Sequence, residues 1–364
     1  MRQTARLAVA ATVLCGCGRR DLDAPSGEPR MSAAERASLA GSLAWVSERG
    51  GHREVVIARA AGGAPRRLAA LPGGDMYAGP VSPDGRAIAL VSARGDRQED
   101  HEEALWLLDL RPGASPRRLL AASRVRNPAF SGGDALLVES DLGSYSDLYR
   151  VSPAGGPPAR ITRDGDSFQP SPAPGGAIVF TSSQAGIAQI YRMDAGGGEP
   201  DRLTSSGAED LAPLVSPTGE QVLFTSARDG RDRLYLVRPD GSHLRPLNPP
   251  VMGEELAPAW SPDGTRVAYL VRSESETRLW ITDLAAGTRR PLSAAGQRDD
   301  QPVFSPDGRH VAFVSERGGN ADIYVARSDG GAVARITDDP AADWLPRWLP
   351  GDGAPRVARR TPRR

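Results

Sequence analysis

Four acidic residues recur at one position in consecutive stretches of the chain, and they are the residues best placed to do chemistry. Each stands three positions before a proline: Asp210, Glu255, Asp299 and Asp343. Carboxylate oxygens are the ligands that hard divalent cations prefer, and they also attract basic side chains. If the fold brings these stretches together, they predict an acidic arc that holds a divalent cation such as Ca²⁺ or a basic peptide segment.

Neighbouring charged residues extend this hypothesis. Three further carboxylates stand near the same positions, and two arginines stand at the equivalent place in an earlier stretch: Asp75, Asp166 and Asp300, with Arg124 and Arg126 facing them. Solvated loop carboxylates that cap turns and pair with nearby arginines explain the pattern at least equally well. A binding arc and a set of turn-capping residues are therefore both consistent with the sequence.

The usual catalytic patterns are missing from the sequence. There is no Gly-x-Ser-x-Gly motif, and the only cysteines, Cys15 and Cys17, lie within the first twenty residues. The four histidines lie far apart, without the paired spacing of metal ligands: His52, His101, His243 and His310. The sequence therefore favours a protein that binds over one that catalyses.

A recurring turn indicates the elements that must position the acidic residues. In Ser261-Pro262-Asp263-Gly264, proline presets φ, aspartate bonds the backbone two residues on, and glycine accepts a positive φ. The turn or a variant of it begins at six serines: Ser82, Ser131, Ser171, Ser216, Ser261 and Ser305. A spacing of about 44 residues with strands alone between the turns is typical of β-propeller blades.

Each repeat unit has the same anatomy. A strand such as His310 to Val314 is followed by a hairpin loop, a second strand and a short outer strand. The middle strand carries an aromatic residue in six of seven units, which we expect to pack between blades: Trp106, Tyr149, Tyr191, Tyr235, Trp280 and Tyr324. The outer strand opens with an arginine in all seven, which we expect to protect an exposed sheet edge.

These motifs together resemble the propeller repeat of the TolB family. The resemblance covers roughly residues 41–350 and rests on Ser-Pro-Asp-Gly, Ser-x-Arg-x-Gly, Ile-Tyr-Val and Arg-Ile-Thr. The same repeat occurs in the propellers of prolyl-oligopeptidase-type enzymes, whose hydrolase domain we do not expect here. The resemblance implies a role at the cell envelope, in its integrity or in transport.

The repeats predict an all-β propeller of seven four-stranded blades, with six as the alternative because TolB-like propellers have six. The first strand, Leu43 to Val46, aligns with the second strand of a blade, and the last, Trp344 to Trp348, aligns with a first strand. One blade is therefore expected to be built from both ends of the chain, which closes the ring.

The N-terminus resembles a bacterial lipoprotein signal. Residues 1–16 combine Arg2 and Arg6 with an apolar run that is too short to span a bilayer, and small Gly16 precedes Cys17. By this resemblance Cys17 is lipidated, residues 17–40 form a tether with a short helical turn near Ala33 to Leu39, and an outer-membrane anchor facing the periplasm is favoured. Residues 351–364 are expected to form a basic disordered tail.

Composition limits the partners. The 45 basic residues balance 45 acidic ones, which gives no net field for nucleic acid. The expected function is a non-catalytic, monomeric propeller lipoprotein that binds envelope proteins and needs no cofactor beyond Ca²⁺ in the channel. The alternative is a lyase, lactonase or glycoside-acting propeller enzyme with a divalent cation at the channel mouth.

Overall fold

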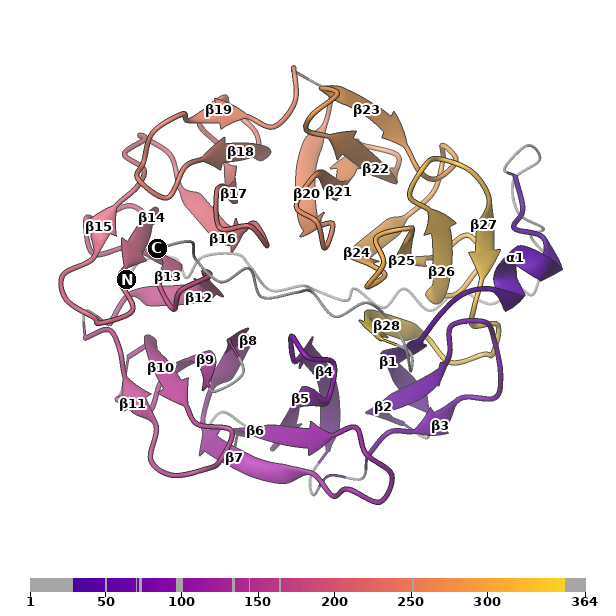
Figure 1. Cartoon of the computed structure of the whole chain (residues 1–364), viewed down its shortest axis with the longest axis horizontal. Coiled ribbons are helices and arrows are strands. Elements are labelled where there is room, and N and C mark those ends of the chain that lie inside the picture. The colour runs from indigo at the N-terminus through magenta and orange to yellow at the C-terminus, as the bar shows by residue number, and fades with distance from the viewer. Residues whose placement is uncertain are drawn as a thin grey trace, which may run out of the picture.

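Seven four-stranded antiparallel sheets form a closed ring in the computed structural model of the chain (Figure 1). The structure describes residues 29–350 except 50, 70, 72–73, 96–100, 133–134, 144, 164 and 251. The predicted all-β propeller with seven blades is confirmed, and the six-bladed alternative is wrong. No helix in the described residues is long and apolar enough to cross a membrane.

The blades follow the chain around the ring, each with its innermost strand first. Blade 1 is β28 (Asp343–Leu349), β1 (Ser42–Arg49), β2 (His52–Arg59) and β3 (Arg66–Arg67). Blade 2 is β4 (Asp75–Val81), β5 (Ala87–Arg94), β6 (Glu102–Asp109) and β7 (Arg117–Ala122). Blade 3 is β8 (Val125–Ser131), β9 (Ala135–Ser140), β10 (Asp147–Val151) and β11 (Ala159–Arg160). Blade 4 is β12 (Ser167–Pro172), β13 (Ile178–Ser182), β14 (Gln189–Met193) and β15 (Asp201–Arg202).

The remaining three blades repeat the same order. Blade 5 is β16 (Asp210–Val215), β17 (Val222–Ser226), β18 (Arg233–Val237) and β19 (Arg245–Pro246). Blade 6 is β20 (Glu254–Trp260), β21 (Arg266–Arg272), β22 (Thr277–Asp283) and β23 (Thr288–Pro291). Blade 7 is β24 (Asp299–Phe304), β25 (His310–Ser315), β26 (Asp322–Arg327) and β27 (Val333–Arg335).

The ring closes in blade 1, as the sequence predicts. The C-terminal strand β28 pairs antiparallel with β1, from Ser42 opposite Leu349 to Ser47 opposite Asp343. Trp348 adds a hydrogen bond from its indole Nε1 to the carbonyl of Ala40. Blade 1 therefore holds the two ends of the propeller together.

The core lies between the blades. Strand residues alternate between two sheet faces, and both faces are covered by neighbouring blades, so apolar side chains fill both. The middle-strand aromatics of four blades are buried, and three of them pair with a phenylalanine of the adjacent strand: Tyr149, Tyr191, Tyr235 and Tyr324. The expectation that these aromatics pack between blades is confirmed for this set.

The antiparallel order gives the ring two distinct faces. The corner face carries the turns between the first and second strands of each blade, such as 261–265, and those between the third and fourth. The hairpin face carries the loops between the second and third strands and the connections from blade to blade. Each inner strand runs from the hairpin face to the corner face.

The Ser-Pro-Asp-Gly corner is held by its serine. In blade 6 the Ser261 hydroxyl donates to Asp263 Oδ1 at 2.6 Å and accepts from the Arg266 backbone N–H at 2.9 Å. Gly264 has a φ of +71°, a value that strains residues with a Cβ. The sequence interpretation of this stretch as a corner is confirmed.

Replacing Ser261 by alanine should lower the free energy of unfolding by about 1–2 kcal/mol, because the buried N–H of Arg266 and the Asp263 carboxylate each lose a partner. Urea denaturation would measure it. Ser273→Ala is the control, since Ser273 is exposed and its hydroxyl makes a long hydrogen bond within the described residues, 3.5 Å to the Glu276 carbonyl. Equal losses in both variants would contradict the assigned role of the corner serine.

Every inner strand carries a β-bulge at a residue followed by proline. In six of them this residue has a φ between +47° and +53°: Asn127, Gln169, Ala212, Ala257, Gln301 and Leu345. Side-chain hydrogen bonds between neighbouring blades offset part of this strain. Gln169 Oε1 accepts from the Ala212 N–H at 2.8 Å, and Gln301 Oε1 accepts from the Leu345 N–H at 2.6 Å.

Residues 29–40 lie against the propeller. Met31 N–H donates to the Val333 carbonyl and the Val333 N–H donates to the Pro29 carbonyl, so this segment pairs with β27. The helix α1 (Ala33–Ala37) follows, with a capping box between Ser32 and Glu35. The predicted short helical turn is confirmed, but this end of the predicted tether is docked onto blade 7.

Candidate functional site

The four acidic residues of the predicted arc occupy equivalent places but are buried. Asp210, Asp299 and Asp343 begin their inner strands and Glu255 is the second residue of β20, and all four side chains belong to residues at most 2% exposed. Their common register is as predicted. Burial of the charge means that each carboxylate needs a partner inside the protein.

Two of the four form ion pairs with a hairpin arginine of the same blade. Arg317 Nη2 donates to Asp299 Oδ1 at 3.0 Å, and Arg228 Nη2 donates to both oxygens of Asp210 at 2.9 Å. Arg317 also lies over the rings of Phe313 and Tyr324. Burial raises the pKa of Asp299, and the Arg317 charge offsets part of that rise.

The other two carboxylates differ from this pattern. Glu255 accepts from Asn248 Nδ2 at 2.8 Å and from the Leu234 N–H of the preceding blade at 3.1 Å. Within the part of the chain that the structure describes, neither carboxylate oxygen of fully buried Asp343 has a hydrogen-bond partner. Burial raises its pKa, and the Ser47 hydroxyl nearby lowers it only in part.

The additional residues of the arc are more exposed. Asp166 is exposed, and half-buried Asp300 accepts from the Gln301 N–H at 2.8 Å. Arg124 is exposed, and Arg126 lies 3.8 Å from Glu103. The described residues contain no group of three His, Cys, Asp or Glu side chains that could hold a metal ion.

The four carboxylates of the predicted acidic arc are therefore buried within the blades. Asp210, Glu255, Asp299 and Asp343 turn into the blades, where three of them hold strands and hairpins together. Binding of Ca²⁺ or a basic peptide by this region stays a prediction. Cys17, the signal peptide 1–16 and the tail 351–364 lie outside the described residues.

One cation of the inner strands has no carboxylate partner within the described part of the chain. Arg347 of β28 donates through Nε to the Gly79 carbonyl of blade 2 and through Nη1 to its neighbour's carbonyl at Pro346, both at 3.0 Å. Burial lowers its pKa to about 10, so it stays charged at neutral pH. The sequence analysis did not identify Arg347 as a candidate. A signal was present, because the residue that follows the bulge proline is uncharged in the other six blades: Val81, Ala129, Ser171, Leu214, Ala259 and Val303.

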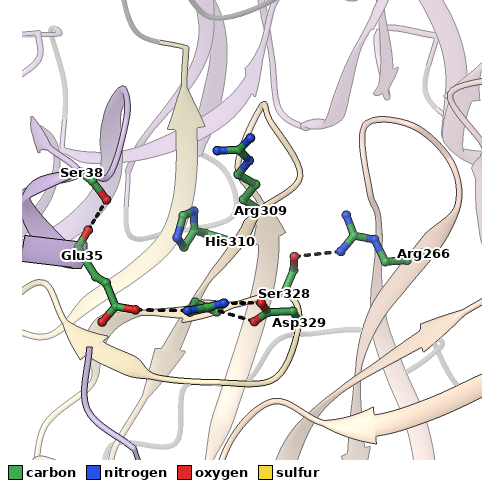
Figure 2. Close-up of a pocket in the computed structure, with 8 residues that line it drawn as sticks. Glu35, Ser38, Arg266, Arg309, His310, Ser328 and Asp329 are labelled. Carbon is green, nitrogen blue, oxygen red and sulfur yellow. Dashed lines mark hydrogen bonds and ion pairs between the residues drawn. The ribbon is translucent and has the colours of Figure 1, made fainter. Parts of the chain in front are cut away.

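A pocket of about 460 Å³ opens on the corner face where α1 meets blades 6 and 7 (Figure 2). Charged side chains dominate its wall: Glu35, Ser38, Arg266, Arg309, His310, Arg327, Ser328 and Asp329. Arg309 lies in the repeated corner of blade 7, and Ser328 and Asp329 lie in its outer turn. The sequence identified both segments only as turns. The contribution of Glu35 and Ser38 had no sequence signal, because they are far away along the chain.

Most of the exposed large apolar side chains belong to loops of the opposite face. Of the five large hydrophobic residues exposed among those the structure describes, four lie in loops of the hairpin face: Leu142, Tyr145, Ile187 and Met252. Tyr145 is 68% exposed and Met252 is 89% exposed. Leu244, at 43%, lies on the corner face.

Comparisons of sequence place the chain near TolB proteins. It is 33% identical over 138 residues to the Tol-Pal system protein TolB of Anaeromyxobacter dehalogenans, which is 38% of this chain and 21% of that protein. It is 36% identical over 71 residues to the uncharacterized peptidase YuxL of Bacillus subtilis, 19% of this chain and 11% of the peptidase. The chain thus spans about a fifth or less of these two relatives.

Solved structures share the fold at low sequence identity. TolB from Acinetobacter baumannii has a TM-score of 0.56 at 21% identity, over 86% of this chain and 67% of that one. A puromycin hydrolase has a TM-score of 0.64 at 16% identity, over 88% of this chain and 55% of the enzyme. An oligogalacturonate lyase in complex with manganese has a TM-score of 0.59 at 15% identity, over 82% and 88%.

A family model matches almost the whole propeller. The model of the TolB beta propeller domain matches residues 26–252 and 250–356, which include all seven described blades. This chain therefore belongs to the TolB beta propeller domain family.

Proposed function

We propose that this protein is a non-catalytic propeller of the cell envelope that binds protein partners through its hairpin face. The observation that carries the proposal is the exposure of four large apolar side chains in loops of that face: Leu142, Tyr145, Ile187 and Met252. Exposed apolar patches on soluble proteins mark interaction sites, and tyrosine and methionine are enriched in protein interfaces. Residues from blades 3 and 4 and from the connection to blade 6 contribute, so a partner would contact several blades.

The burial of the acidic arc supports binding over catalysis. Asp210 and Asp299 are paired within their own blades, so the residues that a cation-dependent lyase, lactonase or glycosidase would need at the mouth have a structural role. The relative from Anaeromyxobacter dehalogenans is named as a Tol-Pal system protein, which supports an envelope partner. We further infer a periplasm-facing monomer anchored in the outer membrane through lipidated Cys17.

The test is site-specific photo-crosslinking in intact envelopes, with the photoreactive residue at Tyr145, Ile187 or Met252. Amine-reactive linkers are unsuitable because the sequence contains no lysine. We expect the same protein to be captured from all three positions. Leu244, which is similarly apolar and exposed but lies on the corner face, is the matched control and should capture nothing.

A second experiment replaces two of the exposed apolar side chains by serine. Tyr145→Ser with Ile187→Ser should lower capture from Met252 by about tenfold, because central aromatic contacts carry much of the energy of an interface. Leu244→Ser should leave capture unchanged. Equal capture from Leu244, or turnover of a glycoside or lactone by the purified chain without any captured protein, would overturn the proposal.

A further inference from the structure

The pocket on the corner face contains more positive charge than its own acids neutralise. Arg327 is held by both acids of the wall, because it donates to Glu35 Oε1 at 3.1 Å and pairs with Asp329 (Figure 2). Within the described residues Arg266 donates to two neutral oxygens, the Ser328 hydroxyl and the Gly308 carbonyl, each at 2.9 Å, and it lies over the Phe304 ring. Arg309 makes no side-chain hydrogen bond or ion pair with any residue that the structure describes.

Two further carboxylates lie near the pocket, those of Asp263 and Asp307, and each accepts hydrogen bonds from residues of its own turn. Asp263 accepts from the Ser261 and Thr265 hydroxyls, at 2.6 and 2.8 Å. Asp307 accepts from the Ser305 hydroxyl at 2.6 Å and from the backbone N–H of Arg309 at 3.1 Å. In the described structure neither comes within ion-pair distance of Arg266 or Arg309, although each arginine helps to lower the pKa of the nearby aspartate. Two guanidinium groups therefore line the pocket without a direct carboxylate contact.

His310 adds an imidazole to the pocket wall beside Arg309 (Figure 2). Its ring is half-buried and stacks on Trp348, with the ring centroids 6.3 Å apart. Burial lowers its pKa, with Asp307 opposing this effect and Arg327 adding to it. At neutral pH the uncharged imidazole can donate one N–H to a ligand without adding a further charge.

We propose that this pocket binds a phosphate monoester, with Arg309 and Arg266 as the residues that contact the phosphoryl oxygens. The planar guanidinium fork matches phosphate oxygens, and two arginines that make no direct ion pair can both contact one phosphoryl group. A volume of about 460 Å³ exceeds what the phosphoryl group needs and leaves room for the organic part of the ester. The site lies on the face opposite the protein-binding surface and is independent of it.

The α1 segment makes the site depend on the docked N-terminal region. Glu35 of α1 pairs with Arg327 and forms one wall, and Leu39 packs into the core between blades 7 and 1. A ligand that bridges Arg309 and the α1 side of the pocket therefore stabilises the docked segment as well as the blades.

The test measures binding of inorganic phosphate and of glucose 6-phosphate to the purified full chain by isothermal titration calorimetry. We expect saturable binding of both, and Arg309→Gln should weaken it about tenfold. Arg309 is exposed and has no side-chain partner, so this variant should keep the fold. Arg238→Gln is the control, because exposed Arg238 lies on the same face, in the turn between the third and fourth strands of blade 5, outside the pocket.

A vesicle arm distinguishes a lipid headgroup from a soluble ester. Vesicles of phosphatidylcholine with or without phosphatidic acid are sedimented with the full chain and with Arg309→Gln. Binding that needs both phosphatidic acid and Arg309, and that resists competition by glucose 6-phosphate, would assign the site to lipid; efficient competition would assign it to a soluble ester. No saturable binding of any of these probes, or an equal loss in Arg238→Gln, would overturn the proposal.

Discussion

Replacing Arg317 by methionine is expected to lower the free energy of unfolding by about 3–5 kcal/mol at pH 7, because it leaves the Asp299 charge buried without its partner. The side chains of both residues are at most 2% exposed, so water cannot take the place of the guanidinium. The lost contacts with Phe313 and Tyr324 add to the effect. Urea denaturation followed by circular dichroism would measure it.

Two comparisons separate this ion pair from a general effect of losing an arginine. Arg298→Met removes a surface arginine 3.8 Å from Glu316, with both side chains more than half exposed, and should cost less than about 1 kcal/mol. Adding Asp299→Asn to Arg317→Met removes the orphaned charge and should recover most of the loss. A double variant as unstable as Arg317→Met alone would show that packing of the arginine, and not the pair, carries the stability.

Acid should reduce the cost of Arg317→Met. Burial raises the pKa of Asp299 already in the intact protein, and removal of the Arg317 charge raises it further. A group whose folded pKa is raised favours the folded state at low pH and opposes it as the pH rises through that pKa. The difference between variant and parent should therefore be largest at neutral pH and shrink as Asp299 becomes protonated.

The blade architecture was predictable because it depends on short turn and strand motifs that recur along the chain. Turns such as Ser261 to Gly264 require particular residues at particular places, and period-two apolar strands follow them. Seven copies then determine the number of blades, and the strand types at the two ends determine the closure through β1 and β28. None of these steps needs the partner of an individual side chain.

Strand periodicity could not predict whether the four acidic residues are buried or exposed, because this depends on the partner that each carboxylate finds in the fold. A signal existed, since Arg228 follows Asp210 and Arg317 follows Asp299 at the same interval of 18 residues. That interval reaches from the start of an inner strand to the hairpin of the same blade. It indicates a buried ion pair within a blade and not a ligand site at the mouth.

The outer-strand arginines illustrate the same limit. The sequence explains them as charges that protect a sheet edge, and the side chains of Arg160 and Arg335 are indeed about one third exposed. Both also bind the aspartate that opens the third strand, Asp147 and Asp322. Burial raises the pKa of Asp322 to about 6, and the charge of Arg335 offsets part of that rise. Arg335 is therefore a structural partner of Asp322 as well as a surface charge. Only the folded register shows the second role.

The phosphate pocket was hidden for a further reason. Glu35 and Arg327 are 292 residues apart, and they meet because the N-terminal segment pairs with β27. The repeat pattern begins only after that segment and contains no information about its docking. Sites between a repeat architecture and its non-repeated ends therefore need a structure.

Asp343→Asn is expected to stabilise the protein, which is unusual for a substitution at a fully buried position. Within the described residues both carboxylate oxygens lack a hydrogen bond, and an unsatisfied buried polar group costs about 1–3 kcal/mol or more when it is charged. Arg49 stands at the hairpin position that Arg317 occupies in blade 7, but it pairs with Asp339 instead. Asparagine keeps the shape, removes the charge and can donate to the Ser47 hydroxyl.

The stabilisation by Asp343→Asn is expected to increase with pH. Burial raises the pKa of Asp343, so the charged form opposes folding once the pH rises through that pKa. The advantage of Asp343→Asn should be close to zero near pH 3, where the parent aspartate is mostly protonated in both states, and should reach about 1–3 kcal/mol at pH 8. Urea denaturation of both proteins from about pH 3 to pH 8 would measure the difference.

The equivalent residue of blade 5 provides a control of opposite sign. Asp210 is as buried as Asp343 but binds Arg228 through both oxygens, so Asp210→Asn should destabilise the protein at pH 8. The two variants make the same chemical change at the same place in two blades and differ only in the arginine. Destabilisation by both would show that Asp343 has a partner in solution, with Arg49 turned towards it and away from Asp339.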